Sequence, residues 1–307
     1  MKLNVKNLKN IATLNQESRI NNLLLLKKEK CFVSCSNDAL IKIFSYENSK
    51  YECLITIKEH SKAIYNIQET KKGEIISSSN DETVKIFSFN LFNKTYQCLL
   101  TFKGHKEEVF KAIELSNANN IYASCSADNI ILIWNRETNQ TQTIFKLKFM
   151  IWCILEISNN RIVFSSSDPQ RPRLIFLNYK NLKYEHEMNL ISCSGNNGIC
   201  NIKNNLIAII SFGKIFIVNT DLYILEQYFN FDEYSYLWCV YSLSNENLVI
   251  SGYVDNIFQY DYKIGKIIGK SSMFLHDLAI LSIIELENNV LITCSTDSTI
   301  KIWKFEC

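Results

Sequence analysis

Short apolar runs separated by polar turns recur along the whole chain, and the clearest set lies between Gly104 and Trp134. Runs at residues 109–115, 121–126 and 130–134 are rich in β-branched and aromatic side chains, and an Ala-Asp-Asn turn separates the last two. Runs of this length, bounded by turn-forming residues, predict β-strands. We therefore expect three consecutive strands joined by tight turns.

Four residues mark this set at fixed spacing. Asp128 lies four residues after Ser124, six before Trp134 and 23 after His105. Nearly the same spacing returns around two other aspartates, in the sets His276, Thr293, Asp297, Trp303 and His60, Ser77, Asp81, Phe87. A partial set contains Ser34, Asp38 and Phe44, with Gln16 near the place of the histidine.

The third strands end at positions that are 41 to 47 residues apart: Phe44, Phe87, Trp134, Leu177, Val218, Tyr260 and Trp303. The histidine, hydroxyl, aspartate and aromatic spacing resembles the WD40 repeat, and the resemblance covers essentially the whole chain. A period of about 40–45 residues with this signature implies four strands per blade of a β-propeller. We therefore expect an all-β, seven-bladed WD40 β-propeller.

One domain is expected to span residues 1–307, with blades at 15–58, 59–103, 104–147, 148–190, 191–230, 231–272, and 273–307 plus 1–14. The last repeat supplies only three predicted strands, whereas residues 8–14 precede blade 1 and align with its last strand. We expect the N-terminal strand to close blade 7, because this pairing covers an otherwise open sheet edge.

Blades 4 to 6 depart from the WD40 pattern. Blade 5 has lost the histidine and the aspartate, and blade 6 is expected to keep Ser251 and Asp255 but ends on Tyr260. Blade 4 carries Pro169 and Pro172 between its second and third strands, and since proline cannot donate to a ladder, we expect a loop there.

Composition and charge narrow the class of protein. The chain has 47% hydrophobic and 21% charged residues and a formal net charge of +2, which favours an ordinary globular protein over a nucleic-acid or membrane surface. The first 15 residues lack the apolar core of a signal peptide, and no apolar run is long enough to span a bilayer, so no membrane insertion is expected.

The eleven cysteines occupy repeat positions rather than metal-ligand spacings. Cys35, Cys125 and Cys294 each lie three residues before a turn aspartate, and no C-x-x-C pair exists. We expect no metal, no cofactor and a reducing compartment, the cytoplasm, with the nucleus as the alternative.

The His, Ser/Thr and Asp sets resemble a catalytic triad. In WD40 proteins the same residues are structural and tie a turn to a strand in each blade. An enzyme needs one triad, whereas a repeated network serves repeated architecture, so we expect no catalytic residue.

A column of seven residues, hereafter the rim column, lies five residues after each histidine or its equivalent: Asn21, Tyr65, Phe110, Trp152, Cys200, Trp238 and Leu281. In WD40 proteins this position commonly contacts partners at the top rim of the propeller. Tyr65, Phe110, Trp152 and Trp238 are therefore predicted to bind a partner, because buried aromatics often anchor interfaces. The alternative is that they pack between blades.

A second candidate is the blade 4 loop, in which Arg171 and Arg173 flank Pro172. Two guanidinium groups on a stiff loop can hold carboxylates or phosphates by paired hydrogen bonds. The alternative is a plain exposed loop.

The resemblance implies a non-enzymatic scaffold or adaptor that binds other proteins of unknown identity, as a subunit of a larger complex. One alternative is a subunit of a ribonucleoprotein or chromatin complex that contacts nucleic acid through the Arg171/Arg173 loop. Another is a propeller hydrolase, which would need titratable residues around the channel, where the rim column is instead apolar.

Overall fold

The computed structural model describes residues 5–158, 160–166, 173–189, 198–211, 213–231, 236–252, 256–272, 275–287 and 289–305. Within these ranges, 28 strands form seven four-stranded antiparallel sheets, and helical structure is limited to two short 3-10 turns, η1 (Val5–Asn7) and η2 (Glu47–Ser49). The chain divides into two compact units, Asn21–Ser192 and Met1–Ile20 with Cys193–Cys307. None of the described helices is long and apolar enough to cross a membrane.

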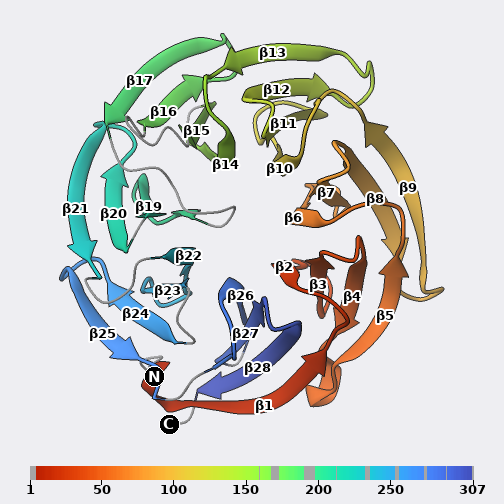
Figure 1. Cartoon of the computed structure of the whole chain (residues 1–307), viewed down its shortest axis with the longest axis vertical. Coiled ribbons are helices and arrows are strands. Elements are labelled where there is room, and N and C mark those ends of the chain that lie inside the picture. The colour runs from red at the N-terminus through yellow and green to blue at the C-terminus, as the bar shows by residue number, and fades with distance from the viewer. Residues whose placement is uncertain are drawn as a thin grey trace. The chain divides into compact units, whose positions relative to one another are not determined.

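The unit Asn21–Ser192 holds blades 1 to 4, each a sheet whose strands follow one another in chain order (Figure 1). Blade 1 consists of β2 (Ile20–Leu25), β3 (Cys31–Ser36), β4 (Ile41–Ser45) and β5 (Glu52–Ile57). Blade 2 consists of β6 (Ile64–Glu69), β7 (Ile75–Ser79), β8 (Val84–Asn90) and β9 (Thr95–Phe102). Blade 3 consists of β10 (Val109–Glu114), β11 (Ile121–Ser126), β12 (Ile130–Asn135) and β13 (Thr141–Lys146). Blade 4 consists of β14 (Ile151–Ile157), β15 (Arg161–Ser166), β16 (Arg173–Asn178) and β17 (Lys183–Asn189).

The second unit holds blades 5 to 7. Blade 5 consists of β18 (Ile199–Asn201), β19 (Leu206–Ser211), β20 (Lys214–Asn219) and β21 (Ile224–Asn230). Blade 6 consists of β22 (Leu237–Ser242), β23 (Leu248–Gly252), β24 (Ile257–Asp261) and β25 (Lys266–Lys270). Blade 7 consists of β26 (Ile280–Leu286), β27 (Val290–Ser295), β28 (Thr299–Phe305) and the N-terminal strand β1 (Leu8–Asn15).

Blade 7 joins the two ends of the chain. Strand β1 pairs with β28 in an antiparallel ladder that runs from Leu8 opposite Phe305 to Asn15 opposite Thr299. The backbone N–H of Gln16 continues this pairing by donating to the Ser298 carbonyl at 2.8 Å. Closure of the last blade by the N-terminal strand, expected from the three-strand repeat, is confirmed.

The apolar core lies mainly between consecutive blades. One cluster joins blades 3 and 4 through side chains such as Cys125, Ile133 and Phe164, and another joins blades 6 and 7 through side chains such as Val249 and Ile283. Within each unit, consecutive sheets bury their facing sides against one another, and this packing holds the innermost strands in place. This packing positions the residues described next.

Candidate partner-binding residues and the polar networks beside them

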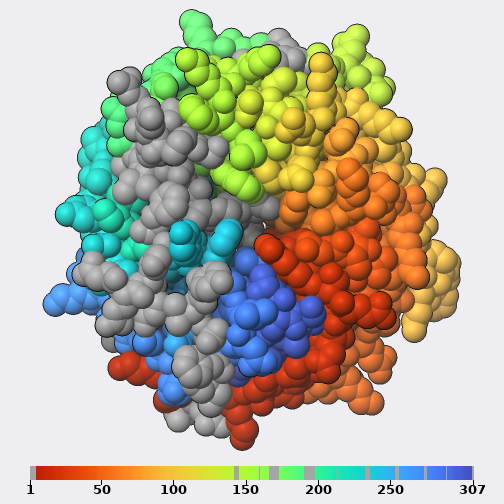
Figure 2. All heavy atoms as spheres, in the orientation of Figure 1, coloured from red at the N-terminus to blue at the C-terminus, as the bar shows by residue number. Residues whose placement is uncertain are grey.

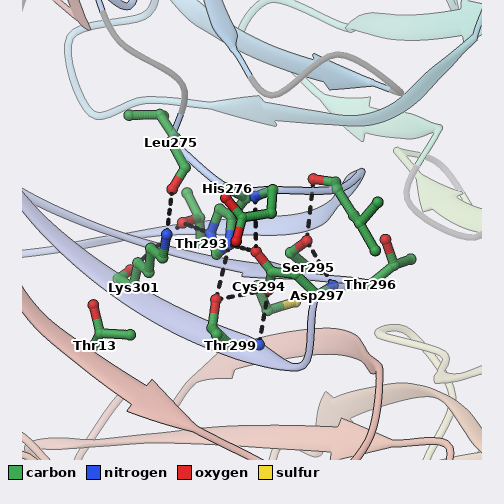
Figure 3. Close-up of polar contacts among 12 residues, drawn as sticks. Thr13, Leu275, His276, Thr293, Cys294, Ser295, Thr296, Asp297, Thr299 and Lys301 are labelled. Atoms are coloured by element: carbon green, nitrogen blue, oxygen red, sulfur yellow. Dashed lines mark hydrogen bonds and ion pairs between the residues drawn. The ribbon is translucent and has the colours of Figure 1, made fainter.

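The histidine set of blade 7 forms one continuous hydrogen-bonded network (Figure 3). His276 Nδ1 lies 2.8 Å from Asp297 Oδ2, and His276 Nε2 lies 2.7 Å from Thr293 Oγ1. Trp303 Nε1 donates to the same Thr293 hydroxyl at 2.8 Å. The network therefore links a turn, the second strand and the third strand of one blade.

Proton directions in this network follow from the donors and acceptors. The Asp297 carboxylate only accepts, so Nδ1 of His276 carries the hydrogen and Nε2 accepts from the Thr293 hydroxyl. Burial lowers the pKa of His276, although Asp297 opposes this shift, and a neutral imidazole fits that pattern. Burial would raise the pKa of Asp297, but hydrogen bonds from His276 and Thr299 outweigh it and hold this pKa below its ordinary value.

Blades 2 and 3 repeat the network. The histidine-to-carboxylate distance is 2.7 Å in blade 2 and 2.9 Å in blade 3, and the histidine-to-hydroxyl distances are 2.7 and 2.8 Å, in the pairs His60–Asp81, His105–Asp128, His60–Ser77 and His105–Ser124. As in blade 7, burial would raise the aspartate pKa in both blades, but the histidine hydrogen bond contributes to lowering it. The structure thus brings together all three predicted His, Ser/Thr and Asp sets.

Each turn aspartate also shapes its own turn. Oδ1 of Asp128 accepts the backbone N–H of Ile130 at 3.0 Å, and Asn129 between them has a φ of 67°. A short acidic side chain that bonds two residues ahead stabilises such a turn. Asp38 of blade 1 makes the equivalent bond to the Leu40 N–H at 3.1 Å.

Blade 1 lacks the histidine, and Asp38 shows the consequence. Its Oδ1 accepts from Ser36 and Leu40, whereas Oδ2 is buried without a hydrogen-bond partner among the described residues. In the complete sets, Oδ2 is the oxygen that receives the imidazole N–H.

The aromatic members differ from blade to blade. Trp303 donates a hydrogen bond, but Trp134 Nε1 is buried and has no partner among the described residues. The Trp134 ring is stacked between Phe102 and Tyr122, with centroid distances of 4.5 and 4.6 Å. Trp134 therefore does not donate as Trp303 does, and stacking holds its ring instead.

In blades 4 to 6 an apolar residue occupies the hydroxyl position. Strand pairing places Phe164, Ile209 and Ile250 where blade 3 has Ser124. The expectation that Ser251 fills this position in blade 6 is wrong, because Ser251 pairs with Cys239 and donates to the Ile280 carbonyl of blade 7 at 3.1 Å. Asp255 lies outside the described residues.

The rim column coincides with a break in the ladder of the innermost strand. The register shifts across Tyr65 in blade 2, Phe110 in blade 3, Trp152 in blade 4, Trp238 in blade 6 and Leu281 in blade 7. A bulge of this kind leaves an extra residue unpaired and redirects its side chain. These five residues of the rim column therefore share a local backbone structure as well as a spacing in the sequence.

Blade 5 does not follow the predicted column. Ile199 pairs with Ile209, as Ala112 pairs with Ser124 in blade 3, so Cys200 lies three residues beyond the place of Phe110. The assignment of Cys200 to the rim column is therefore wrong. Position 197, which takes its place, lies outside the described residues.

Three rim aromatics of blades 2 to 4 form a continuous row. The Tyr65 and Phe110 rings lie 5.5 Å apart, and the Phe110 and Trp152 rings are stacked at 4.3 Å. Phe110 is only 2% exposed, whereas Tyr65 and Trp152 are partly exposed. Phe110 thus packs between blades and separates the rings of Tyr65 and Trp152. Those two rings are the ones accessible to solvent.

Trp238 of blade 6 lines a pocket of about 500 Å³. The other lining residues come from blade 7 and from the segment after β1, and they are Arg19, Asp277, Leu278, Ala279, Leu281 and Thr296. Figure 2 shows the C-terminal part of blade 7, in blue, exposed on the viewed face of the molecule.

Arg173, predicted to lie on a binding loop, is the first residue of β16. Its Nη1 lies 2.9 Å from Glu187 Oε1 on the outer strand β17, and Tyr184 donates to the second oxygen of that carboxylate at 2.6 Å. The Glu187 carboxylate offsets the charge of Arg173, which weakens the attraction of this guanidinium for an external anion. Arg171 lies outside the described residues.

The cysteines of the described ranges are free thiols, and most of them are buried. Burial raises the pKa of Cys35 and Cys125. No cluster of metal-ligating side chains is found in the part of the chain that the structure describes.

Sequence reasoning missed a column of glutamates near the ends of the innermost strands. Each accepts a backbone N–H from the turn after the innermost strand of the preceding blade, in the pairs Glu69–Lys27, Glu114–Lys71, Glu156–Ser116 and Glu285–Ser244. Blades 5 and 6 have Asn201 and Ser242 at this position. The signal in the sequence was a glutamate five residues after the start of the innermost strand in blades 2, 3, 4 and 7.

Comparison with known proteins agrees with this geometry. A family model for the WD domain, G-beta repeat, matches residues 51–88, 96–135 and 274–304. The structure is similar to the WD40 β-propeller domain of Doa1, with a TM-score of 0.78, 16% sequence identity and coverage of 97% of each chain. No curated protein matches the sequence. The matched segments contain the complete histidine sets of blades 2, 3 and 7, so the chain carries WD40 repeats at these places and has the fold of a seven-bladed β-propeller.

Proposed function

We propose that this protein is a non-enzymatic scaffold or adaptor that binds other proteins as a subunit of a larger complex. The observation that carries the proposal is the bulge in five innermost strands, which leaves Tyr65, Trp152 and Trp238 unpaired in their ladders and partly exposed. Exposed aromatics on a rigid sheet lose little conformational entropy on binding and commonly anchor interfaces. WD40 propellers generally bind other proteins, which supports the same reading.

The histidine sets support a structural role rather than catalysis. The side chains of His60, His105 and His276 are 0% exposed, and the hydroxyl-bearing residues beside them are also buried. A nucleophile and base of this kind must lie within hydrogen-bond reach of a substrate. A substrate reaches neither group without opening the blade.

The nucleic-acid alternative finds less support. Its only described residue, Arg173, is held by Glu187. Phosphate contacts would make binding to a generic RNA or DNA oligonucleotide fall steeply with salt, so a filter-binding salt titration tests this alternative directly. We place the protein in a reducing compartment, the cytoplasm or the nucleus, because its described cysteines are free thiols.

The scaffold proposal is tested by quantitative capture of native partners on the full chain. Trp152→Ala is expected to weaken capture of at least one partner by about tenfold, as the loss of a buried anchor does. Phe92→Ala is the matched control, since Phe92 is a 96% exposed aromatic in the turn between β8 and β9. The proposal fails if the wild-type chain captures no partner, or if folded Trp152→Ala and Trp238→Ala variants both retain every partner.

A further inference from the structure

We propose that the Trp238 pocket binds a partner segment in which a large apolar side chain stands next to a lysine or arginine. This inference rests on the proposed scaffold function, because it names the kind of partner that one of its exposed aromatics takes. The pocket of about 500 Å³ has the size of a site for a side chain with its adjoining main chain.

The apolar part of the partner is argued from the pocket walls. Trp238 and Leu281 are the bulge residues of β22 and β26, and Ala279 adds a small buried side chain between them and the turn. Leu278 also lines the pocket and is 53% exposed. A leucine or phenylalanine side chain inserted here would cover this exposed apolar surface.

Trp238 is not fixed in the way that Trp303 is. Its Nε1 is buried and has no acceptor among the described residues, whereas Trp303 Nε1 is held by Thr293. The indole of Trp238 is therefore held by packing alone and can adjust to a ligand at little cost in hydrogen bonds.

The basic part of the partner is argued from charge. Two charged residues line the pocket, Arg19 and Asp277. Arg19 already interacts within the chain, whereas the exposed Asp277 carboxylate makes no hydrogen bond or ion pair with any described residue. The backbone N–H of Asp277 donates to Asp297 at 3.1 Å, so the polar network of blade 7 holds the main chain from which this carboxylate extends.

A lysine or arginine is the complement of these groups. Its charged end pairs with the Asp277 carboxylate by a charge-assisted hydrogen bond, and a cation near the Trp238 ring is attracted to its face. An acidic residue at the same place would be repelled by Asp277. Of two peptides that differ only in the charge of this residue, the pocket is therefore expected to bind the basic peptide more tightly than the acidic one.

The test uses the full chain labelled with 5-fluorotryptophan. The sequence has four tryptophans, so four ¹⁹F resonances are expected, and Trp238→Phe identifies the one from Trp238. The probes are the capped peptides Ac-Ala-Leu-Arg-Ala-NH₂, Ac-Ala-Leu-Glu-Ala-NH₂ and Ac-Ala-Ala-Arg-Ala-NH₂. The Leu-Arg peptide is expected to shift the Trp238 resonance with a Kd of about 1 mM, and the other two to bind at least about fivefold more weakly.

Asp277→Asn is expected to weaken the Leu-Arg peptide by about fivefold and to remove its advantage over the Leu-Glu peptide. Glu107→Gln is the matched control, because Glu107 is an exposed acid in the equivalent turn of blade 3, and it should change nothing. The proposal is overturned if the Leu-Arg peptide at about 10 mM leaves the Trp238 resonance unmoved, or if the Leu-Glu peptide binds equally well.

These outcomes separate the pocket from the function. If no peptide binds but Trp152→Ala loses native partners, the pocket proposal is wrong and the scaffold function stands. If the wild-type chain captures no native partner, the scaffold function is wrong whatever the peptides do.

Discussion

Glu114, the last residue of β10, accepts the backbone N–H of Lys71 at 2.6 Å, across the boundary between blades 3 and 2. Lys71 returns the contact, since its Nζ donates to the Leu115 carbonyl at 3.0 Å. A turn of one blade is thereby tied to the strand end of the next. The same glutamate contact recurs in three other pairs of blades.

Loss of this contact is expected to destabilise the fold without affecting partner capture. Glu114→Ala leaves the Lys71 N–H without its charged acceptor and should lower the free energy of unfolding by about 1 kcal/mol, measured by urea denaturation. Glu107→Ala, on the exposed turn before the same strand, should cost less than about 0.5 kcal/mol. Equal costs at the two positions would show that the contact adds nothing.

The turn aspartates are expected to differ according to their histidine. Asp128→Ala removes the acceptor of the buried His105 Nδ1–H and should cost about 1–3 kcal/mol. Asp38→Ala, in the blade without a histidine, removes only the turn bonds and relieves a buried unpaired oxygen, so it should cost less. Thermal melts of both variants decide the point, and a larger loss at Asp38 would contradict the structural role of the networks.

Stability is expected to fall in two steps on acidification. The pKa of His276 is lowered in the folded chain, so the unfolded chain binds its proton first as the pH drops through the ordinary histidine pKa of about 6.5. The unfolded state then carries more protons than the folded one, and the free energy of unfolding decreases. A second loss is expected below about pH 4, where Asp81, Asp128 and Asp297 bind protons in the unfolded chain before they do in the folded chain.

Urea denaturation from about pH 8 down to about pH 3 measures both steps. His276→Gln should flatten the first step and leave the second in place. An unchanged slope between about pH 7 and pH 5 in this variant would assign the first step to other groups.

Deletion of residues 1–14 is expected to open the outer edge of blade 7. Strand β28 would then lose its ladder with β1 and expose unpaired backbone groups, which promotes association of sheet edges. We expect a lower melting temperature and concentration-dependent self-association by light scattering. A truncated chain that melts like the full chain and stays monomeric would contradict the role of β1.

The fold could be predicted from the sequence wherever the aspartate turn is present. Around Asp297, β27 and β28 are two of the three strands predicted for the last repeat, because the turn fixes the register of the hairpin on both sides. Blades 5 and 6 lack a complete set, and there the assignments of Cys200 and Ser251 were wrong. A shift of the strand register by one residue moves every side chain to the opposite face of the sheet. Without the aspartate turn, the spacing of the repeats is not accurate enough to exclude such a shift.

The candidate site was less predictable, because it depends on contacts between blades. Spacing grouped Tyr65, Phe110 and Trp152 correctly but did not show that Phe110 is buried between the other two. Nor did it show that Phe102 and Tyr122 enclose Trp134, since Phe102 belongs to the preceding blade. Such contacts arise only when neighbouring sheets pack.

The bulge in the innermost strands has a consequence for how this protein can change. A bulge residue makes no pair in its ladder, so replacing Trp152 or Trp238 alters the chemistry offered to a partner but not the register of the blade. The paired residues on either side of the bulge form the ladder of the sheet, and the bulge residue takes no part in it. Substitutions at the bulge residues can therefore change the binding preference of one blade at a time, while the residues that determine the fold stay the same.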